Sequence, residues 1–275
     1  MAPSSADVAA SRALVDELIA ETKLYSSSSA VKELLEFTAR LRHMAPFNAM
    51  LLHIQKPGLS YAMTAHDWRT RFGRRPKAHA RPLIVLRNFG PVDFVYDVQD
   101  TEGEPLPDTA FAFPTAGALP TEVILDAERA LRRSALLIEW LDKGDLQAGY
   151  TRKISNHGDS AQLEAFEIGL NRNHAPPVQF VTLAHELAHI YLGHCGSDAK
   201  RKVAWRRPSH DLREVEAEVV AYLVAKRSGL SPRSESYLDS YQGAFENLDL
   251  HRIMKCTNRI ESLLGLPLDF GNGPR

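Results

Sequence analysis

A pentapeptide of sequence HELAH, residues 185–189, lies inside an apolar run from Val178 to Leu192. No glycine or proline interrupts this run, and the glycine that follows it is typical of a helix end. On a helix, residues four apart share a face, so His185 and His189 can bind one metal ion while Glu186 points at a water molecule on that metal. The pattern therefore predicts a buried helix with hydrolytic chemistry. The alternative is a core helix whose histidines only satisfy hydrogen bonds.

A third metal ligand is expected, because hydrolytic zinc sites take three protein ligands and keep one position open. In the segment REVEAE, residues 213–218, Glu214 and Glu218 share a helix face and Glu216 points away from them. We expect Glu214 to bind the metal and Glu218 to accept the free N–H of a ligating imidazole. A solvated acidic face is the interpretation for Glu216. Zn²⁺ is the expected ion, with another divalent transition metal such as Mn²⁺ as the alternative, and Cys195 is expected to be a helix-end thiol.

The same residues predict a mechanism of peptide hydrolysis. The metal lowers the pKa of its water, and Glu186 takes the proton and later delivers it to the leaving amine. A predicted strand at 165–170, just before the motif helix, is expected to offer an unpaired edge to an extended peptide. Candidates for stabilising the oxyanion, each explained more simply by packing or a surface position, are His194, Tyr222, Tyr237 and Tyr241.

Length and composition favour two domains and exclude a disulfide framework. The chain has 275 residues, of which 44% are hydrophobic, and this is enough for a sizeable core. Its 2 cysteines suit a reducing compartment. The first 20 residues include acidic side chains where a signal peptide needs a basic start, and the apolar runs are too short to span a membrane. We therefore expect a cytoplasmic protein without a membrane segment.

The expected fold class is α+β, with N-terminal helices and a small β-sheet. Hydrophobic periodicity in this first part predicts helices at 7–22, 30–43, 46–54 and 65–72, and strands at 82–86 and 94–98. Prolines and glycines between residues 100 and 120 leave little room for regular structure and predict a linker. We place an N-terminal domain at 1–107, a linker at 108–120 and a metallopeptidase domain at 121–275.

The second domain is expected to combine helices with a small antiparallel or mixed sheet. Apolar residues at helical spacing predict helices at 121–141, 178–192, 211–226 and 237–264. Short apolar segments predict strands at 149–154 and 165–170. This order of helix, strands, motif helix and acidic helix is that of small zinc-dependent peptidase domains.

Basic residues gather between positions 69 and 87, a segment that contains no acidic residue. Trp68 and Phe72 lie beside them in the sequence. Basic side chains can neutralise phosphates while aromatic rings stack on bases, which is how single strands are held without much sequence preference. A solvated, charged loop explains the composition equally well. The candidate contacts to DNA are Trp68, Arg69, Arg71, Arg74, Arg75, Lys77 and Arg81.

A longer pattern extends beyond the pentapeptide. Leu192-Gly193-His194 follows HELAH, and Glu214-x-x-Ala217-Glu218-x-x-Ala221 comes next. Together these residues resemble the ImmA/IrrE type of metallopeptidase. The resemblance implies a zincin-like domain with Glu214 as the third ligand. The sequence departs from the family at Glu218, where Asn is usual.

The N-terminal part resembles a different group of proteins. The similarity covers PFNAMLL at 46–52, Thr64 to Trp68, the basic segment through Arg81, and YDVQDTEGEPLP at 96–107. These segments are similar to ArdC-type antirestriction proteins. That resemblance implies a domain that binds single-stranded DNA in front of a zinc metallopeptidase domain. The sequence departs from the family at 74–80.

Two functions of different classes follow from these patterns. The first is a cytoplasmic metal-dependent endopeptidase coupled to a domain that binds single-stranded DNA. The second is a non-proteolytic DNA-binding antirestriction or regulatory protein with a structural or idle metal site, which a fourth ligand such as Cys195 or Glu218 would indicate. The basic loop at 200–208 lies between the ligand segments and could cover the cleft or guide a partner.

Overall fold

The computed structural model describes residues 17, 25, 27–87, 92–106, 121–144, 148–154, 165–230 and 247–266. The chain divides into two compact units. Unit 1 comprises Met1–Phe113 with Leu268–Arg275, and unit 2 comprises Pro114–Pro267. The expected linker at 108–120 and most of the expected first helix at 7–22 lie outside the described residues. No helix in the described part of the chain is long and apolar enough to cross a membrane.

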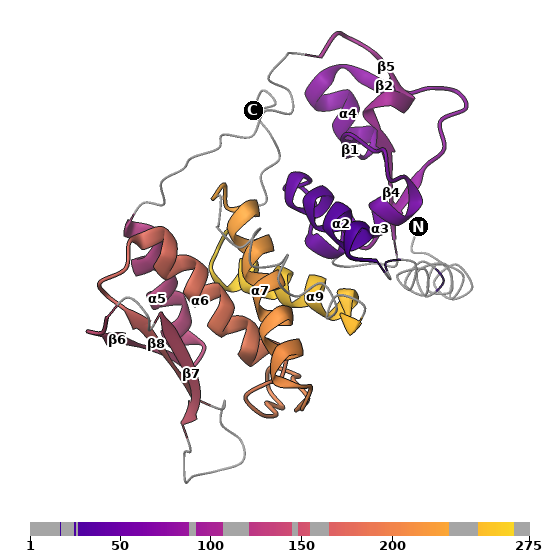
Figure 1. Ribbon diagram of the computed structural model, residues 1–275. Helices are drawn as coiled ribbons and strands as arrows, with labels where there is room; N and C mark the ends of the chain where they lie inside the picture. The colour runs from indigo at the N-terminus through magenta and orange to yellow at the C-terminus, as the bar shows by residue number, and fades with distance from the viewer. Residues whose placement is uncertain are drawn as a thin grey trace. The chain divides into compact units, whose positions relative to one another are not determined.

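Unit 1 combines helices with two small antiparallel sheets (Figure 1). Its described helices are α2 (Ser28–Arg40), α3 (Pro46–Gln55), α4 (Ala65–Phe72) and the short 3-10 helix η2 (Val98–Asp100). Its described strands are β1 (Ala62–Met63), β2 (Arg74–Pro76), β3 (Leu83–Val85), β4 (Asp93–Asp97) and β5 (Thr101–Gly103). One sheet has the order β1-β4-β3, and the other pairs β2 with β5.

The helix ends of unit 1 follow from local sequence. The hydroxyls of Ser27 and Thr64 accept backbone N–H groups in the first turns of α2 and α4. Pro46 occupies the first turn of α3, where its missing N–H costs nothing. Gly73 ends α4 with a φ of 60°, a left-handed conformation that glycine adopts without strain. The prediction of a helix over 65–72 ending at this glycine is therefore confirmed.

Trp68 belongs to the core of unit 1 rather than to its surface. Its side chain is 0% exposed and packs with Tyr61, Met63 and Phe72. The indole Nε1–H donates a hydrogen bond to the carbonyl of Tyr96 over 2.8 Å. An indole held in this way cannot stack on a base, which corrects the expectation that Trp68 contacts DNA. Phe72 is likewise buried, so the basic segment is not interleaved with accessible aromatic rings.

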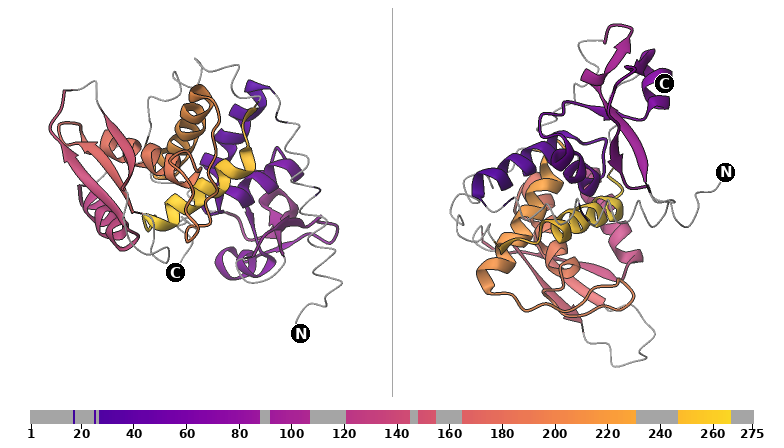
Figure 2. Two further views of the ribbon diagram at one scale, coloured as in Figure 1. Left: turned by 90° about the horizontal axis from the view of Figure 1, so that it is seen from below. Right: turned by 90° about the vertical axis from the view of Figure 1, so that its right-hand side faces the viewer.

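Unit 2 is a small mixed sheet covered by helices, and the α+β class is confirmed. Its described helices are α5 (Thr121–Arg133), α6 (Pro176–Tyr191), α7 (His210–Arg227) and α9 (Leu250–Leu263). Its strands β6 (Leu136–Leu141), β7 (Gly149–Ile154) and β8 (Ala165–Asn171) have the order β6-β8-β7. β6 runs parallel to β8, and β7 runs antiparallel to it. The motif helix α6 lies between the sheet and the helices α7 and α9 (Figures 1 and 2).

Two predicted elements of unit 2 are wrong in part. The helix expected over 121–141 ends at Arg133, and its last third is the strand β6. Ala135 has a φ of 53°, which breaks the helix, and Leu136 then pairs with Phe166 of β8. The helix expected over 237–264 begins at Leu250 after the N-cap Asp249, and its segment 237–246 lies outside the described residues.

The strand expected to offer a free edge is the central strand of its sheet. β8 pairs with β6 on one side and with β7 on the other, so its backbone is not available to a peptide. Alternation of polar and apolar residues cannot distinguish a central strand from an edge strand, because order in the sheet depends on long-range pairing. Within the described residues, the free edges of this sheet belong to β6 and β7.

Candidate metal centre

Three predicted ligands converge where α6 packs against α7. His185, His189 and Glu214 offer ligand atoms that all lie within 4.8 Å of one another. The Nε2 atoms of His185 and His189 are 3.1 Å apart. Oε2 of Glu214 lies 3.5 Å from Nε2 of His185, and Oε1 lies 3.8 Å from Nε2 of His189. Tetrahedral ligands at zinc-to-nitrogen bond lengths are separated by about 3.3 Å. Two imidazoles and a carboxylate at these separations fit a divalent transition metal such as Zn²⁺ or Mn²⁺.

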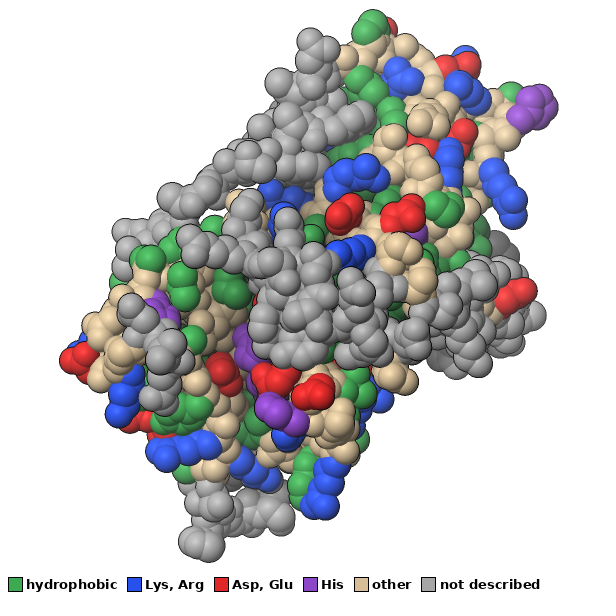
Figure 3. Space-filling model, viewed as in Figure 1, with side chains coloured by type: hydrophobic (Ala, Val, Ile, Leu, Met, Phe, Trp, Pro, Cys, Tyr) green, Lys and Arg blue, Asp and Glu red, His purple; other side chains and the backbone are tan. Residues whose placement is uncertain are grey.

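The remaining nitrogen of His185 faces the residue that was expected to orient it. Its Nδ1 lies 3.3 Å from Oε2 of Glu218, one helical turn after Glu214. Because a carboxylate only accepts, the proton between them belongs to Nδ1, and in the neutral ring Nε2 has the lone pair that a metal needs. Histidine and acidic side chains adjoin on the face of unit 2 seen in Figure 3.

His189 is held by a buried network that the sequence did not reveal. Its Nδ1 lies 2.9 Å from Nδ1 of His194, whose Nε2 lies 2.9 Å from Glu216. Arg206 clamps the same carboxylate with two hydrogen bonds of 2.9 and 3.0 Å. Glu216 is 0% exposed, so the expected solvated acidic position is wrong. α7 packs against both α6 and α9, which buries this side of the helix as well.

The hydrogen-bond order of this network favours one tautomer of His189 when His194 is neutral. The carboxylate of Glu216 accepts the proton of His194 Nε2, which leaves the Nδ1 of a neutral His194 as an acceptor. That atom accepts the Nδ1–H of His189, whose Nε2 therefore points a lone pair at the other two ligands. His194 uses both ring nitrogens here, which argues against its expected alternative role at an oxyanion.

Glu186 is positioned by the neighbouring strand β7. The Thr151 hydroxyl lies 2.8 Å from Oε2 of Glu186, to which it donates a hydrogen bond. Burial raises the pKa of Glu186, and the Thr151 hydrogen bond opposes that increase. Gly149 lets β7 approach closely, because a Cβ atom there would lie 2.6 Å from Thr182 Cγ2 on α6. Thr151 is therefore a second site residue that the sequence did not indicate.

The electrostatics of the ligand set favour positive charge beside Glu214. A hydrogen bond with His185 lowers the pKa of Glu214 to about 2. Burial lowers the pKa of His185, but hydrogen bonds with Glu214 and Glu218 outweigh this and raise it to about 9. Burial and the neighbouring His185 lower the pKa of His189 to about 3. Without a metal, Glu214 is therefore charged and His185 holds the balancing proton, which a metal ion would displace.

The other candidates lie apart from the ligand set. Burial raises the pKa of the Cys195 thiol to about 11, and this residue is not among the converging ligands of the described residues. Tyr222 is a buried residue of α7, 5% exposed, with Lys226 over its ring. Tyr237 and Tyr241 lie outside the described residues.

Several side chains of the basic segment of unit 1 have partners within the unit, and Lys77 is one of them, since it donates a hydrogen bond to the Gln99 carbonyl over 2.8 Å. Arg74 donates hydrogen bonds to Thr101 and to the Glu104 carbonyl, so it ties β2 to β5. Arg71 lies 3.7 Å from Asp67, and Arg75 lies 3.1 Å from Glu102. The exposed members of the segment are Arg69, Arg75, Lys77 and Arg81.

Comparisons with known proteins matched one solved structure and one family model. The solved structure is the manganese(II)-bound crystal structure of the antirestriction protein ArdC from the R388 plasmid, with 18% identity and a TM-score of 0.41 over 79% of this chain and 82% of that one. No curated protein matches the chain significantly. The Peptidase M78 family, described as the IrrE N-terminal-like domain, matches residues 145–242, the segment that carries HELAH and Glu214.

Proposed function

We propose that unit 2 is a metal-dependent endopeptidase. The observation that carries this proposal is the convergence of His185, His189 and Glu214 with Glu186 held beside them by Thr151. A bound Zn²⁺ or Mn²⁺ would acidify a water molecule and polarise a peptide carbonyl. Glu186 would serve as the base that accepts a proton from the attacking water and returns it to the leaving amine. The test is hydrolysis of an unfolded protein by the metal-loaded full chain, with Glu186→Gln as its inactive counterpart.

The free edge of β7 is the proposed binding site for an extended peptide. β7 pairs with β8 on one side only within the described residues, and its Thr151 contacts Glu186. A peptide added to this edge would gain backbone hydrogen bonds and lie next to the catalytic carboxylate. The proposed peptide-binding strand is thus β7 and not β8, because β8 is the central strand of the sheet. β7 would then both bind the substrate and position Glu186, the proposed base.

Thr151→Val is expected to lower kcat about tenfold while KM changes little. The substitution keeps the shape of the side chain but removes a hydrogen bond to a charged group, worth about 1.5 kcal/mol, and each 1.36 kcal/mol in the barrier is about tenfold in rate. Steady-state kinetics on an unfolded protein substrate measure both constants. Thr151→Ser keeps the hydroxyl and serves as the matched control. Equal kcat in the valine and serine variants would show that Thr151 does not position the base.

A second proposed function is binding of single-stranded DNA by unit 1. The exposed Arg69, Arg75, Lys77 and Arg81 support it, whereas the buried Trp68 takes no part. Each phosphate contact on a single strand contributes about −0.7 to the slope of log K against log salt concentration. Replacing Arg69, Lys77 and Arg81 by alanine should make this slope shallower by up to about 2. Titration of a labelled oligonucleotide at several salt concentrations measures it, and an unchanged slope would remove these residues from the interface.

The competing interpretation is a non-proteolytic DNA-binding antirestriction or regulatory protein with an idle metal site. A fourth protein ligand would favour it. The geometry offers little support, because Glu218 is engaged with His185 Nδ1 and Cys195 lies outside the ligand set. Metal-edge X-ray absorption on the full chain separates the two, since three protein ligands with one light solvent ligand fit the enzyme and four protein ligands fit the idle site.

A further inference from the structure

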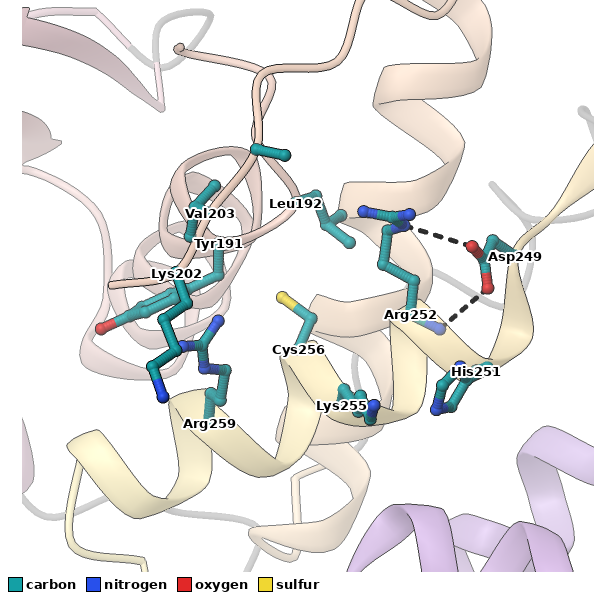
Figure 4. Close-up of a pocket in the computed structure, with 11 residues that line it drawn as sticks. Tyr191, Leu192, Lys202, Val203, Asp249, His251, Arg252, Lys255, Cys256 and Arg259 are labelled. Atoms are coloured by element: carbon teal, nitrogen blue, oxygen red, sulfur yellow. Dashed lines mark hydrogen bonds and ion pairs between the residues drawn. The ribbon is translucent and has the colours of Figure 1, made fainter. Parts of the chain in front are cut away.

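A cavity of about 230 Å³ lies in unit 2, apart from the predicted metal ligands. One wall is formed by α9, and the opposite wall by the end of α6 and the loop at 202–204 (Figure 4). None of the residues that line it belongs to the ligand set of the metal centre. Part of the basic loop at 200–208 therefore lines a cavity that is separate from the metal centre.

The side chains around this cavity carry an excess of positive charge. Lys202, Arg252, Lys255 and Arg259 face it, and Asp249 is the one acidic residue in its lining. The remaining titratable groups do not offset this charge. Burial raises the pKa of the Cys256 thiol, which stays neutral, and burial together with Lys255 lowers the pKa of His251. The carboxylate of Glu216 also raises the pKa of the Cys256 thiol, but Arg206 already balances its charge.

The two arginines are fixed in place, while the two lysines are available. Arg252 pairs with Asp249 over 3.2 Å. Arg259 donates a hydrogen bond to the carbonyl of Arg201 and lies 5.4 Å from the ring centroid of Tyr191. Lys202 and Lys255 are exposed, and neither forms an ion pair with an acidic side chain in the described part of the chain. The cavity is thus lined by two guanidinium groups that are held in place and by two exposed lysines.

The backbone that presents Lys202 is strained and firmly held. Lys202 has a φ of 54°, a conformation that is costly for a residue with a Cβ atom. Two backbone hydrogen bonds between Asp198 and Val203, of 2.9 and 2.8 Å, close the turn around it. The Ala204 carbonyl packs on Gly193, where a Cβ atom would lie 2.1 Å from that oxygen. Strain of about 1–3 kcal/mol persists only where surrounding contacts enforce it, and such residues cluster at binding sites.

We propose that this cavity binds a phosphate group. Four basic side chains against one carboxylate leave an excess of positive charge along the lining, and a multiply charged anion would offset it. Planar guanidinium groups and ammonium groups are the usual partners of phosphate oxygens. The volume of about 230 Å³ is below the roughly 300–1,000 Å³ of pockets for drug-sized ligands, so a phosphate with little attached to it fits. The phosphate belongs either to a small phosphomonoester or to the backbone of a nucleic acid.

Thermal unfolding of the full chain tests this site at constant ionic strength. Inorganic phosphate, thymidine 5′-monophosphate and a thymidine dinucleotide with one phosphodiester are the probes, and sodium chloride is the reference. Because a ligand that binds only the folded state stabilises it, Tm should rise and saturate with inorganic phosphate. In the double variant Lys202→Glu with Lys255→Glu, phosphate affinity should fall at least about tenfold.

Matched variants keep this result interpretable. Lys143→Glu makes the same charge change at an exposed position outside the cavity and should respond like the original chain. Lys255→Glu alone changes an exposed helix position, so it reports on the site even if the double variant folds poorly. A phosphate bound at the metal or to unit 1 would survive both cavity variants.

The outcomes separate the two sources of phosphate. If inorganic phosphate and the monophosphate raise Tm through the cavity and the dinucleotide does not, the ligand is a phosphomonoester. If the dinucleotide raises Tm through the cavity as well, the ligand is a nucleic acid backbone. A rise in Tm no larger than that in chloride, or equal rises in the original chain and the Lys255→Glu variant, would overturn the proposal.

Discussion

Glu186→Gln is expected to abolish peptide hydrolysis while the metal stays bound. Glutamine keeps the size of the side chain and can still accept the Thr151 hydrogen bond, but it cannot take a proton from water. General base catalysis contributes about 10²–10⁴-fold to the rate, so kcat should fall by at least the lower figure. The measurement combines cleavage of an unfolded protein with elemental analysis of the same sample. Full metal content with lost cleavage is the expected pair of results.

A glutamate elsewhere in unit 2 supplies the control for this substitution. Glu128 lies on α5 and pairs with Arg132 over 2.8 Å, so Glu128→Gln removes a carboxylate without touching the metal centre. This variant should cleave at the original rate. If Glu186→Gln and Glu128→Gln cleave equally well, Glu186 is not the base and the proposed mechanism fails.

Local sequence signals predicted the elements whose ends depend on a few neighbouring residues. α4 and α6 begin and end close to their expected positions, because caps, prolines and glycines act within one turn of the helix. For the segment after Arg133, local signals predicted the wrong element. Leu136 to Leu141 continue a helical pattern, yet they form β6 because β8 offers them a parallel partner. A contact between residues about thirty positions apart decides that structure, and no local pattern contains it.

The residues of the metal centre also fall into two groups, those that local spacing predicts and those that depend on tertiary packing. Helix geometry alone brings His185 to His189, and helix periodicity places Glu214 and Glu218 one turn apart, so these residues could be proposed from their spacing. Thr151, His194 and Arg206 come from a strand and loops whose positions depend on packing. Glu216 was misjudged because a helix packed on two partners buries more than one face.

Glu216→Gln is expected to weaken metal binding about 10–100-fold without unfolding the protein. Outer partners that orient a ligating histidine typically contribute this much to metal affinity, and Glu216 acts on His189 through His194. A glutamine cannot neutralise Arg206, and its amide can donate toward His194 as readily as it accepts. Either change loosens the tautomer that presents His189 Nε2 to a metal. Competition with a chelator of known affinity measures the loss, and thermal unfolding of the metal-free protein reports on the fold.

A second buried glutamate separates this role from a merely structural one. Glu261 is 6% exposed and pairs with Arg227 over 2.6 Å, far in the sequence from the metal ligands. Glu261→Gln also disrupts a buried carboxylate–arginine pair, so it should destabilise the metal-free protein but leave metal affinity unchanged. If both variants lose stability and neither loses metal affinity, the network from His189 to Arg206 supports only the fold. If only Glu216→Gln loses metal affinity, the Glu216 carboxylate orients the His189 ring for metal binding. It does so through two hydrogen bonds, by way of His194.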